Sequence, residues 1–279
     1  MQFYLTGLGN LYENRDHILS SVVEADGLCL DGALMPDHYM WGSEIGHHMA
    51  HPYSTLETWT TLTYLAGKTR RISLGTLVTP ITLRHPAVLA KMLSTLDVLS
   101  GGRVVLGVGA GWSEVEFRGY SRWLDTGARV DRTVEALNLM LRLWEEPEVT
   151  HHGKYYHAEG AVLEPKPVQK PHPRLLFGSQ GRRMLSVAGR HADICFVPPW
   201  AGTKADEILS TIAEAADKAG RKVAFMLGDM ESDSYDPSAY SKGIDVAEKA
   251  GASYYSVSFP RSDPSAMGRF AEEVMPSYR

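Results

Sequence analysis

Eight short apolar runs alternate with longer amphipathic segments along the whole 279-residue sequence. The expected strands cover residues 3–8, 28–35, 72–80, 104–109, 175–178, 194–199, 223–227 and 254–259, and the expected helices cover residues 15–24, 55–66, 86–99, 130–146, 182–191, 205–219, 238–250 and 264–275. This alternation indicates parallel strands joined by right-handed crossovers. Eight such units predict one α/β domain over residues 1–279, a closed (β/α)8 TIM barrel. The alternative is an open doubly wound sheet, but neither terminal run carries the charge or proline that protects an edge strand.

Helix-end signals support several of these elements. Pro86 suits a first-turn position, Gly220 and Gly251 follow periodic runs as stop signals, and Asp263–Pro264 is typical of a helix start. Residues 148–173 break the alternation, and we expect a hairpin and a proline-rich connection there, inserted before the fifth strand.

Composition limits the partners of the chain. The formal net charge is −5, which disfavours nucleic acids and anionic membrane surfaces because both attract clustered Lys and Arg. The sequence shows neither a signal-peptide pattern nor an apolar run long enough to span a membrane, so we expect a cytoplasmic protein. Cys29 and Cys195 lie far apart in apolar runs, and we expect two buried thiols without redox chemistry.

In a barrel of this type, the active site lies at the carboxyl ends of the strands. Asp37 and His38 follow the second expected strand, and successive residues of a strand point to opposite faces. One of the two side chains can therefore face the mouth while the other braces a neighbour. His38 is the better acid or base candidate because imidazole exchanges protons near neutral pH. The alternative is a histidine that only completes a loop hydrogen bond.

The run "VVLGVGAGW", residues 104–112, places glycines at positions 107, 109 and 111. It is not a dinucleotide fingerprint, because Trp112 stands where the third glycine is needed. Glycines at a strand end would instead let a flat ring or a ribityl chain approach the main chain. The fifth expected strand ends in "FGSQGRR", residues 177–183, which leads directly into a helix. The free N–H groups of that helix start, with Arg182 and Arg183 beside them, indicate a phosphate site.

Other site types find little support. No expected strand ends in the lysine that a Schiff-base enzyme needs. The cluster His47, His48 and His51 has only Glu44 as a nearby carboxylate, so we expect a solvated or substrate-lining loop and no metal site. The "HHG" sequence at residues 151–153 is more typical of a hairpin turn.

These motifs together resemble a known family. The stretch Leu74–Phe117, with "PDHY" before it and "FGSQGRRMLSVAGRHADI" after it, is similar to the bacterial luciferase-like flavin oxidoreductases, and the resemblance covers nearly the whole chain. Residues 116–144 are most similar to the branch that uses the deazaflavin coenzyme F420. The resemblance implies a (β/α)8 barrel that holds the cofactor ring in its mouth, and relatives that commonly pair as homodimers.

The resemblance also assigns residues to the cofactor. It implies a cis peptide between Leu77 and Val78, after Thr76, that buttresses the ring, and it places Asp37 and His38 at the ring's reactive edge. It matches Gly109, Ala110 and Gly111 to the cofactor tail, and Gly178, Ser179, Gln180, Gly181 and Arg182 to the phosphate. Trp112 departs from the sugar-phosphate dehydrogenases, which have a glutamate there.

We therefore expect an F420-dependent oxidoreductase that transfers a hydride between C5 of the deazaflavin and a small organic substrate. The alternatives are an FMN-dependent monooxygenase that uses reduced flavin and O₂, and a flavin-binding protein without turnover. The expected pocket wall is Tyr39, Trp41, Trp112 and Trp200, which would favour an apolar or aromatic substrate, although each could equally pack in the core.

Overall fold

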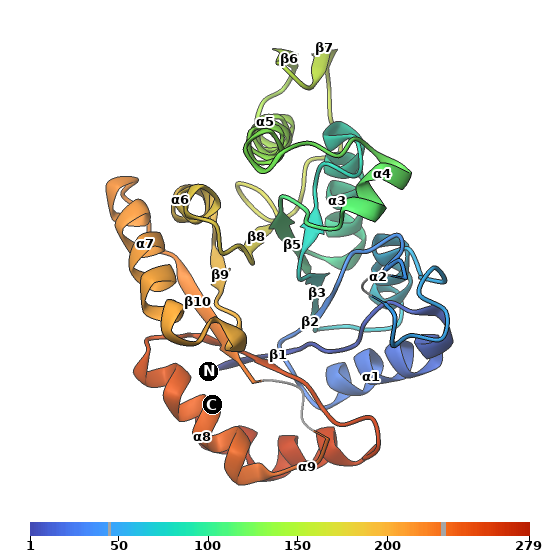
Figure 1. The fold of residues 1–279 in the computed structure, drawn as a ribbon, viewed down its shortest axis with the longest axis vertical. Helices are drawn as coiled ribbons and strands as arrows, with labels where there is room; N and C mark the ends of the chain where they lie inside the picture. Colours follow the sequence, from blue (N-terminus) through green and yellow to red (C-terminus); the bar gives the residue numbers. More distant parts are fainter. Residues whose placement is uncertain (44–45, 230–232) are drawn as a thin grey trace.

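The computed structural model describes residues 1–43, 46–229 and 233–279. Within these residues, eight parallel strands form the barrel: β1 (Gln2–Leu5), β2 (Gly32–Met35), β3 (Ser73–Thr76), β5 (Val104–Gly109), β8 (Arg174–Phe177), β9 (Ile194–Phe196), β10 (Ala224–Gly228) and β11 (Tyr254–Val257). Their order is β3-β2-β1-β11-β10-β9-β8-β5, and the pairing of β3 with β5 closes the ring (Figure 1). The predicted closed barrel is therefore confirmed, and the open sheet is excluded.

Helices surround the barrel (Figure 1). The α-helices are α1 (Arg15–Gly27), α2 (Thr58–Ala66), α3 (Pro86–Ser100), α4 (Glu114–Tyr120), α5 (Thr126–Glu145), α6 (Arg182–His191), α7 (Ala205–Lys218), α8 (Pro237–Lys249) and α9 (Ala266–Glu273), with short 3₁₀ turns at Tyr12–Asn14, Pro199–Lys204 and Met275–Tyr278. The helix α4 is absent from the sequence prediction. In the described part of the chain, no helix has the length and apolarity that crossing a bilayer requires.

The predicted helix ends hold in most places. Pro86 is the first residue of α3, and Gly220 and Gly251 follow α7 and α8 with φ of +65° and +80°, the left-handed conformation that ends a helix. The expected start at Asp263–Pro264 is early, because the Asp263 carboxylate accepts the N–H of Ser265 (3.1 Å) in a turn before α9.

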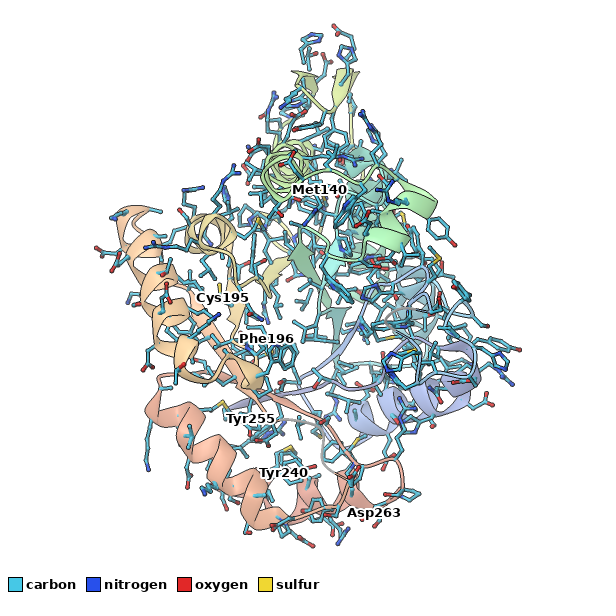
Figure 2. The ribbon with its side chains drawn as sticks, viewed as in Figure 1. Met140, Cys195, Phe196, Tyr240, Tyr255 and Asp263 are labelled. Carbon is cyan, nitrogen blue, oxygen red and sulfur yellow. The ribbon has the colours of Figure 1, made fainter. Side chains whose placement is uncertain are left out.

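Alternation along the strands divides the core into two layers. One set of strand side chains packs outward against the helices, and a smaller set fills the barrel: Tyr4, Leu34, Val105, Leu176, Ile194, Phe196 and Met226. Neighbouring residues of β9 show the division, since Cys195 belongs to the outer layer and Phe196 to the inner one (Figure 2). The packed interior leaves the strand ends as the place for a site.

Two segments depart from the simple repeat. β6 (Val149–His152) and β7 (His157–Ala161) form an antiparallel hairpin beyond α5, as predicted for the insertion (Figure 1). The short strand β4 (Thr79–Pro80) pairs with the end of β5, and the Leu77–Val78 bond before it is a cis peptide. Residues 77 and 78 are called the floor segment below.

The prediction for the cysteines is half wrong. Cys195 is buried, and burial raises the pKa of its thiol to about 12. Cys29 is exposed, because it lies in the turn after α1 with φ of +65° instead of inside β2, which begins three residues later.

Candidate active site

A cavity of about 560 Å³ opens at the carboxyl ends of the barrel strands. All eight strands or the loops after them contribute to its wall, which comprises Thr6, Gly7, His38, Leu77, Val78, Pro80, Gly111, Trp112, Gly178, Phe196, Pro199, Trp200, Asp229, Ser256 and Ser258. Closure of the sheet is what brings these residues together, since they span most of the sequence.

The strand-end glycines have two different roles. A Cβ on Gly107 would lie 2.0 Å from the carbonyl oxygen of Thr76, and one on Gly109 would lie 2.5 Å from Cγ2 of Val78. Both glycines therefore make room for the β3–β4 segment of the chain itself and are absent from the cavity wall. Gly111 does line the cavity, and its φ of +78° favours glycine.

The predicted cofactor residues are only partly at the cavity. The floor segment, Gly111 and Gly178 line it. Thr76 is fully buried, and its hydroxyl accepts the N–H of Gly107 (3.2 Å). Ala110, Ser179, Gln180, Gly181 and Arg182 also lie outside the wall.

Asp37 and His38 point in different directions, as the alternation of a strand predicts. Asp37 is fully buried, and Arg84 donates two hydrogen bonds to its carboxylate, at 2.7 and 2.9 Å. Thr79 donates a third at 2.8 Å. Burial pushes the pKa of Asp37 upward, and the guanidinium opposes that push. Asp37 thus braces the loop beside the floor segment and is not part of the cavity wall.

His38 faces the cavity and is held from behind by a carboxylate. Its Nδ1 lies 3.1 Å from Oε2 of Glu116, whose side chain is 1% exposed. The other oxygen of Glu116 accepts the N–H of Tyr39 at 2.6 Å. An ionised carboxylate only accepts hydrogen bonds, so it places the imidazole proton on Nδ1. This leaves Nε2 as the nitrogen available to a ligand.

Asn10 holds the segment after His38 in place. It is fully buried, and its Nδ2 donates to the carbonyl oxygen of His38 at 2.6 Å. Its Oδ1 accepts the indole N–H of Trp41 at 3.0 Å, which packs Trp41 against the imidazole with ring centroids 4.2 Å apart. The imidazole is therefore fixed on two sides.

Sequence reasoning missed both Glu116 and Asn10. Ser113 and Glu116 form an S-x-x-E pattern that signals an ordinary helix start, and the Ser113 hydroxyl does accept the N–H of Glu116 (3.4 Å). In a complete capping box, the glutamate side chain would bond back to the backbone N–H of the serine. The Glu116 carboxylate instead turns to His38. Asn10 carries no motif at all.

Two of the four predicted aromatic wall residues line the cavity. Trp112 and Trp200 line the cavity, and both remain more than half exposed at its rim. Tyr39 packs under Arg84, and Trp41 packs behind His38. Phe196, Asp229, Ser256 in β11 and Ser258 just after β11 were not foreseen.

A helix amino terminus stands next to the cavity, as predicted. Gly178 lines the wall, and α6 begins four residues later with Gly181 as a cap that supplies no side-chain oxygen. The first N–H groups of α6 are thus left without a side-chain cap. Arg183 turns away toward Asp131, whereas Arg182 stands at the first position of the helix.

The loop histidines do not form a metal cluster among the residues that the structure covers. His47 and His48 pack ring against ring, 5.4 Å between centroids, and His51 is exposed. Glu44 lies outside the described residues.

Fold and site together define a (β/α)8 barrel with a ligand-sized cavity at its strand ends, a floor of Leu77 and Val78 and a carboxylate-held histidine. The sequence model of the luciferase-like monooxygenases matches residues 3–230. The chain therefore belongs to the luciferase-like monooxygenase family.

Individual relatives differ in their cofactors. The chain is 34% identical over 203 residues to an F420-dependent glucose-6-phosphate dehydrogenase of Kineococcus radiotolerans, covering 71% of this chain and 58% of the relative. It is 29% identical over 191 residues to an FMNH(2)-dependent dimethylsulfone monooxygenase of Pseudomonas putida, covering 68% and 49%. The chain thus spans about half to three fifths of the length of these relatives.

The fold is also similar to a solved structure, an F420-dependent secondary alcohol dehydrogenase in complex with an F420-acetone adduct. The TM-score is 0.85 at 21% identity, and the match covers 100% of this chain and 99% of the other. At this identity the likeness shows the shared fold.

Proposed function

We propose that this protein is an F420-dependent oxidoreductase that acts on a small organic substrate. The observation that carries the proposal is the cavity itself: a barrel mouth with Leu77 and Val78 as its floor, a helix start without a side-chain cap at one side and a fixed histidine in its wall. The F420-dependent relative and the F420-dependent structural neighbour support the choice of cofactor.

The residues present fit a planar cofactor with a phosphorylated tail. The floor segment offers an apolar surface for the ring, and the absence of a side chain at Gly111 and Gly178 keeps the main chain accessible. The free N–H groups of α6 and the Arg182 guanidinium would hold the phosphate. The bound cofactor would supply hydride chemistry, while the protein supplies position and exclusion of water.

The chain's own contribution to proton transfer is His38. Because Glu116 fixes Nδ1, Nε2 would exchange a proton with the substrate oxygen in the cavity. Asp37 is a positioning residue in this scheme, since its carboxylate is bound to Arg84 and Thr79.

The wall also restricts the substrate. Among the described residues that line the cavity, Asp229 is the one acidic group and none is Lys or Arg. By the family resemblance, Trp112 stands where the sugar-phosphate dehydrogenases are expected to have a glutamate. A phosphate dianion would therefore meet no lysine or arginine in the described wall, which favours neutral or cationic substrates such as alcohols.

In the first experiment, the purified protein is titrated with F420 and, separately, with FMN, and binding is monitored by the absorbance of the cofactor. We expect saturable binding of F420. The second is an activity panel of neutral secondary alcohols beside glucose 6-phosphate, in which we expect only the neutral compounds to reduce the cofactor. Preference for glucose 6-phosphate would overturn the substrate proposal and leave the cofactor proposal intact.

An FMN-dependent monooxygenase is the second candidate, because one relative uses reduced FMN. Tight binding of FMN without a response to F420 would reverse the order of the two proposals. His38→Ala separates catalysis from binding: if no chemistry is detected in the parent and the variant binds cofactor normally, the protein is a flavin-binding protein without turnover.

We also propose that residues 1–279 act as one domain in the cytoplasm, as a homodimer. Both cysteines are free, as expected in a reducing compartment. A largely apolar groove between α2 and α3 leaves Val88 and Leu99 exposed and would accept a second copy. Leu99→Lys should lower the mass in light scattering from dimer to monomer, whereas Val246→Lys on α8 should not.

A further inference from the structure

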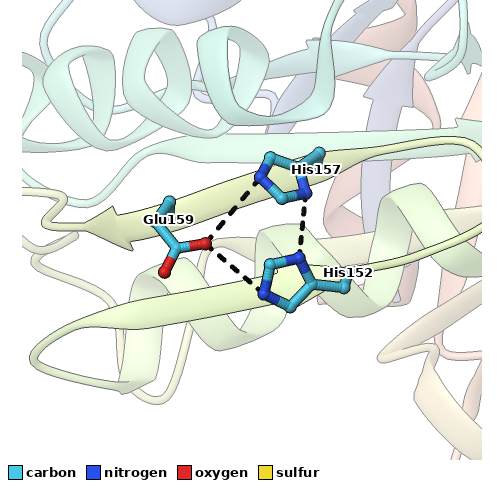
Figure 3. Close-up of side chains that lie close together, drawn as sticks. All are labelled: His152, His157 and Glu159. Carbon is cyan, nitrogen blue, oxygen red and sulfur yellow. Dashed lines mark hydrogen bonds and ion pairs between the residues drawn. The ribbon is translucent and has the colours of Figure 1, made fainter.

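Three metal-ligating side chains meet on the β6–β7 hairpin, away from the cavity (Figure 3). His152 and His157 stand opposite each other in the strand register, and their Nδ1 atoms are 3.0 Å apart. Their Nε2 atoms lie 3.4 and 3.8 Å from the same oxygen of Glu159. One ligand atom from each side chain lies within 4.8 Å of the other two.

These separations suit a transition-metal ion. Zinc bonds to imidazole nitrogen and carboxylate oxygen are about 2.0–2.2 Å long, so tetrahedral donors stand about 3.3–3.6 Å apart. The distances from Glu159 to the two histidines differ from that range by a few tenths of an ångström at most. Two imidazoles and a carboxylate are also a ligand set that zinc uses.

The hairpin holds the three side chains on one face before any ion binds. The carboxylate of Glu135 on α5 accepts the N–H groups of Tyr155 (2.9 Å) and Tyr156 (2.7 Å) and fixes the turn. His151, on the opposite face, contacts the same carboxylate at 3.4 Å. Ion binding would therefore need only small rotations of side chains.

Exposure keeps the cost of binding low. The side chains of His152, His157 and Glu159 are 62%, 64% and 69% exposed. Water remains available to complete the coordination shell, and little protein has to move.

We propose that His152, His157 and Glu159 form a surface site for one Zn²⁺ or chemically similar divalent transition-metal ion. The ion would cross-link the two strands of the inserted hairpin, because the ligands come from both. This site is separate from the proposed F420 site and does not depend on it.

Isothermal titration with ZnCl₂, after treatment with a chelator, tests the proposal. The parent protein should bind one ion, and His152→Ala and His157→Ala should each weaken binding by at least about tenfold. Mutation of a residue that only hydrogen-bonds to a metal ligand already lowers metal affinity by about 10- to 100-fold, and loss of a ligand itself should cost no less. His48→Ala, an exposed histidine outside the hairpin, is the matched control and should bind like the parent. Lower pH should weaken binding, because the ligands must be deprotonated.

Cobalt gives a readout of geometry. The visible absorption of bound Co²⁺ should be present in the parent and absent in His152→Ala. Circular dichroism and thermal unfolding check that each variant is folded. Unchanged zinc affinity in both hairpin variants, or loss of binding in His48→Ala instead, would overturn the proposal.

Discussion

Replacing Arg84 by methionine tests the buried ion pair of Arg84 and Asp37 beside the candidate active site. Arg84 is 8% exposed and Asp37 fully buried, and the two share hydrogen bonds at 2.7 and 2.9 Å. Arg84→Met therefore leaves a buried carboxylate without its cation, which typically costs about 3–5 kcal/mol. At about 2–4 °C per kcal/mol for a domain of similar size, the melting temperature should fall by roughly 6–20 °C.

The deficit should depend on pH in a defined direction. Burial already raises the pKa of Asp37 in the parent protein, and loss of the opposing guanidinium raises it further in the variant. The folded variant then binds a proton that the unfolded chain has lost, so its stability falls as pH rises through and above the ordinary aspartate range. The difference from the parent should be largest near neutral pH and smaller in acid.

The assay is urea unfolding at a series of pH values. Arg118→Met, which breaks the exposed pair with Glu114, is the control and should cost about 0.5 kcal/mol or less. The double variant Asp37→Leu/Arg84→Met removes both charges and should recover a large part of the lost stability. The Thr79 hydroxyl loses Asp37 as an acceptor in this variant, but it can still donate to the Thr76 hydroxyl at 3.0 Å. A deficit below about 1 kcal/mol, or one that grows in acid, would refute the reasoning.

Two further predictions concern the cavity. Glu116→Gln should lower kcat/KM by about 10- to 100-fold, because one charge-assisted hydrogen bond to His38 is lost. It should also change the tautomer of His38 seen in ¹⁵N NMR. Glu114→Gln on the same helix should do neither, and equal spectra for the two variants would contradict the role assigned to Glu116. Gly109→Ala places a Cβ 2.5 Å from the floor segment, so it should cost about 1–3 kcal/mol in thermal unfolding and weaken cofactor binding. At Gly268 nothing lies within 4 Å of an added Cβ, so Gly268→Ala should leave cofactor binding intact.

The candidate site was predictable where a residue's role follows from its place on a strand. His38, the floor segment, Trp112 and Gly178 all follow strand ends, and all line the cavity. Tyr39 and Trp41 occupy similar places in the sequence but turn away. Which way a loop side chain turns depends on packing partners such as Arg84, and no local pattern records them.

The sequence by itself determined the barrel, because each strand-helix unit carries its own apolar period and its own end signals. It also determined where the site lies, since a closed parallel barrel brings all its strand ends to one rim. Only the tertiary structure decided which groups cooperate there. Glu116 reaches His38 across 78 positions, and Arg84 reaches Asp37 across 47. Such pairs exist only once the sheet has closed, so short-range patterns could not reveal them.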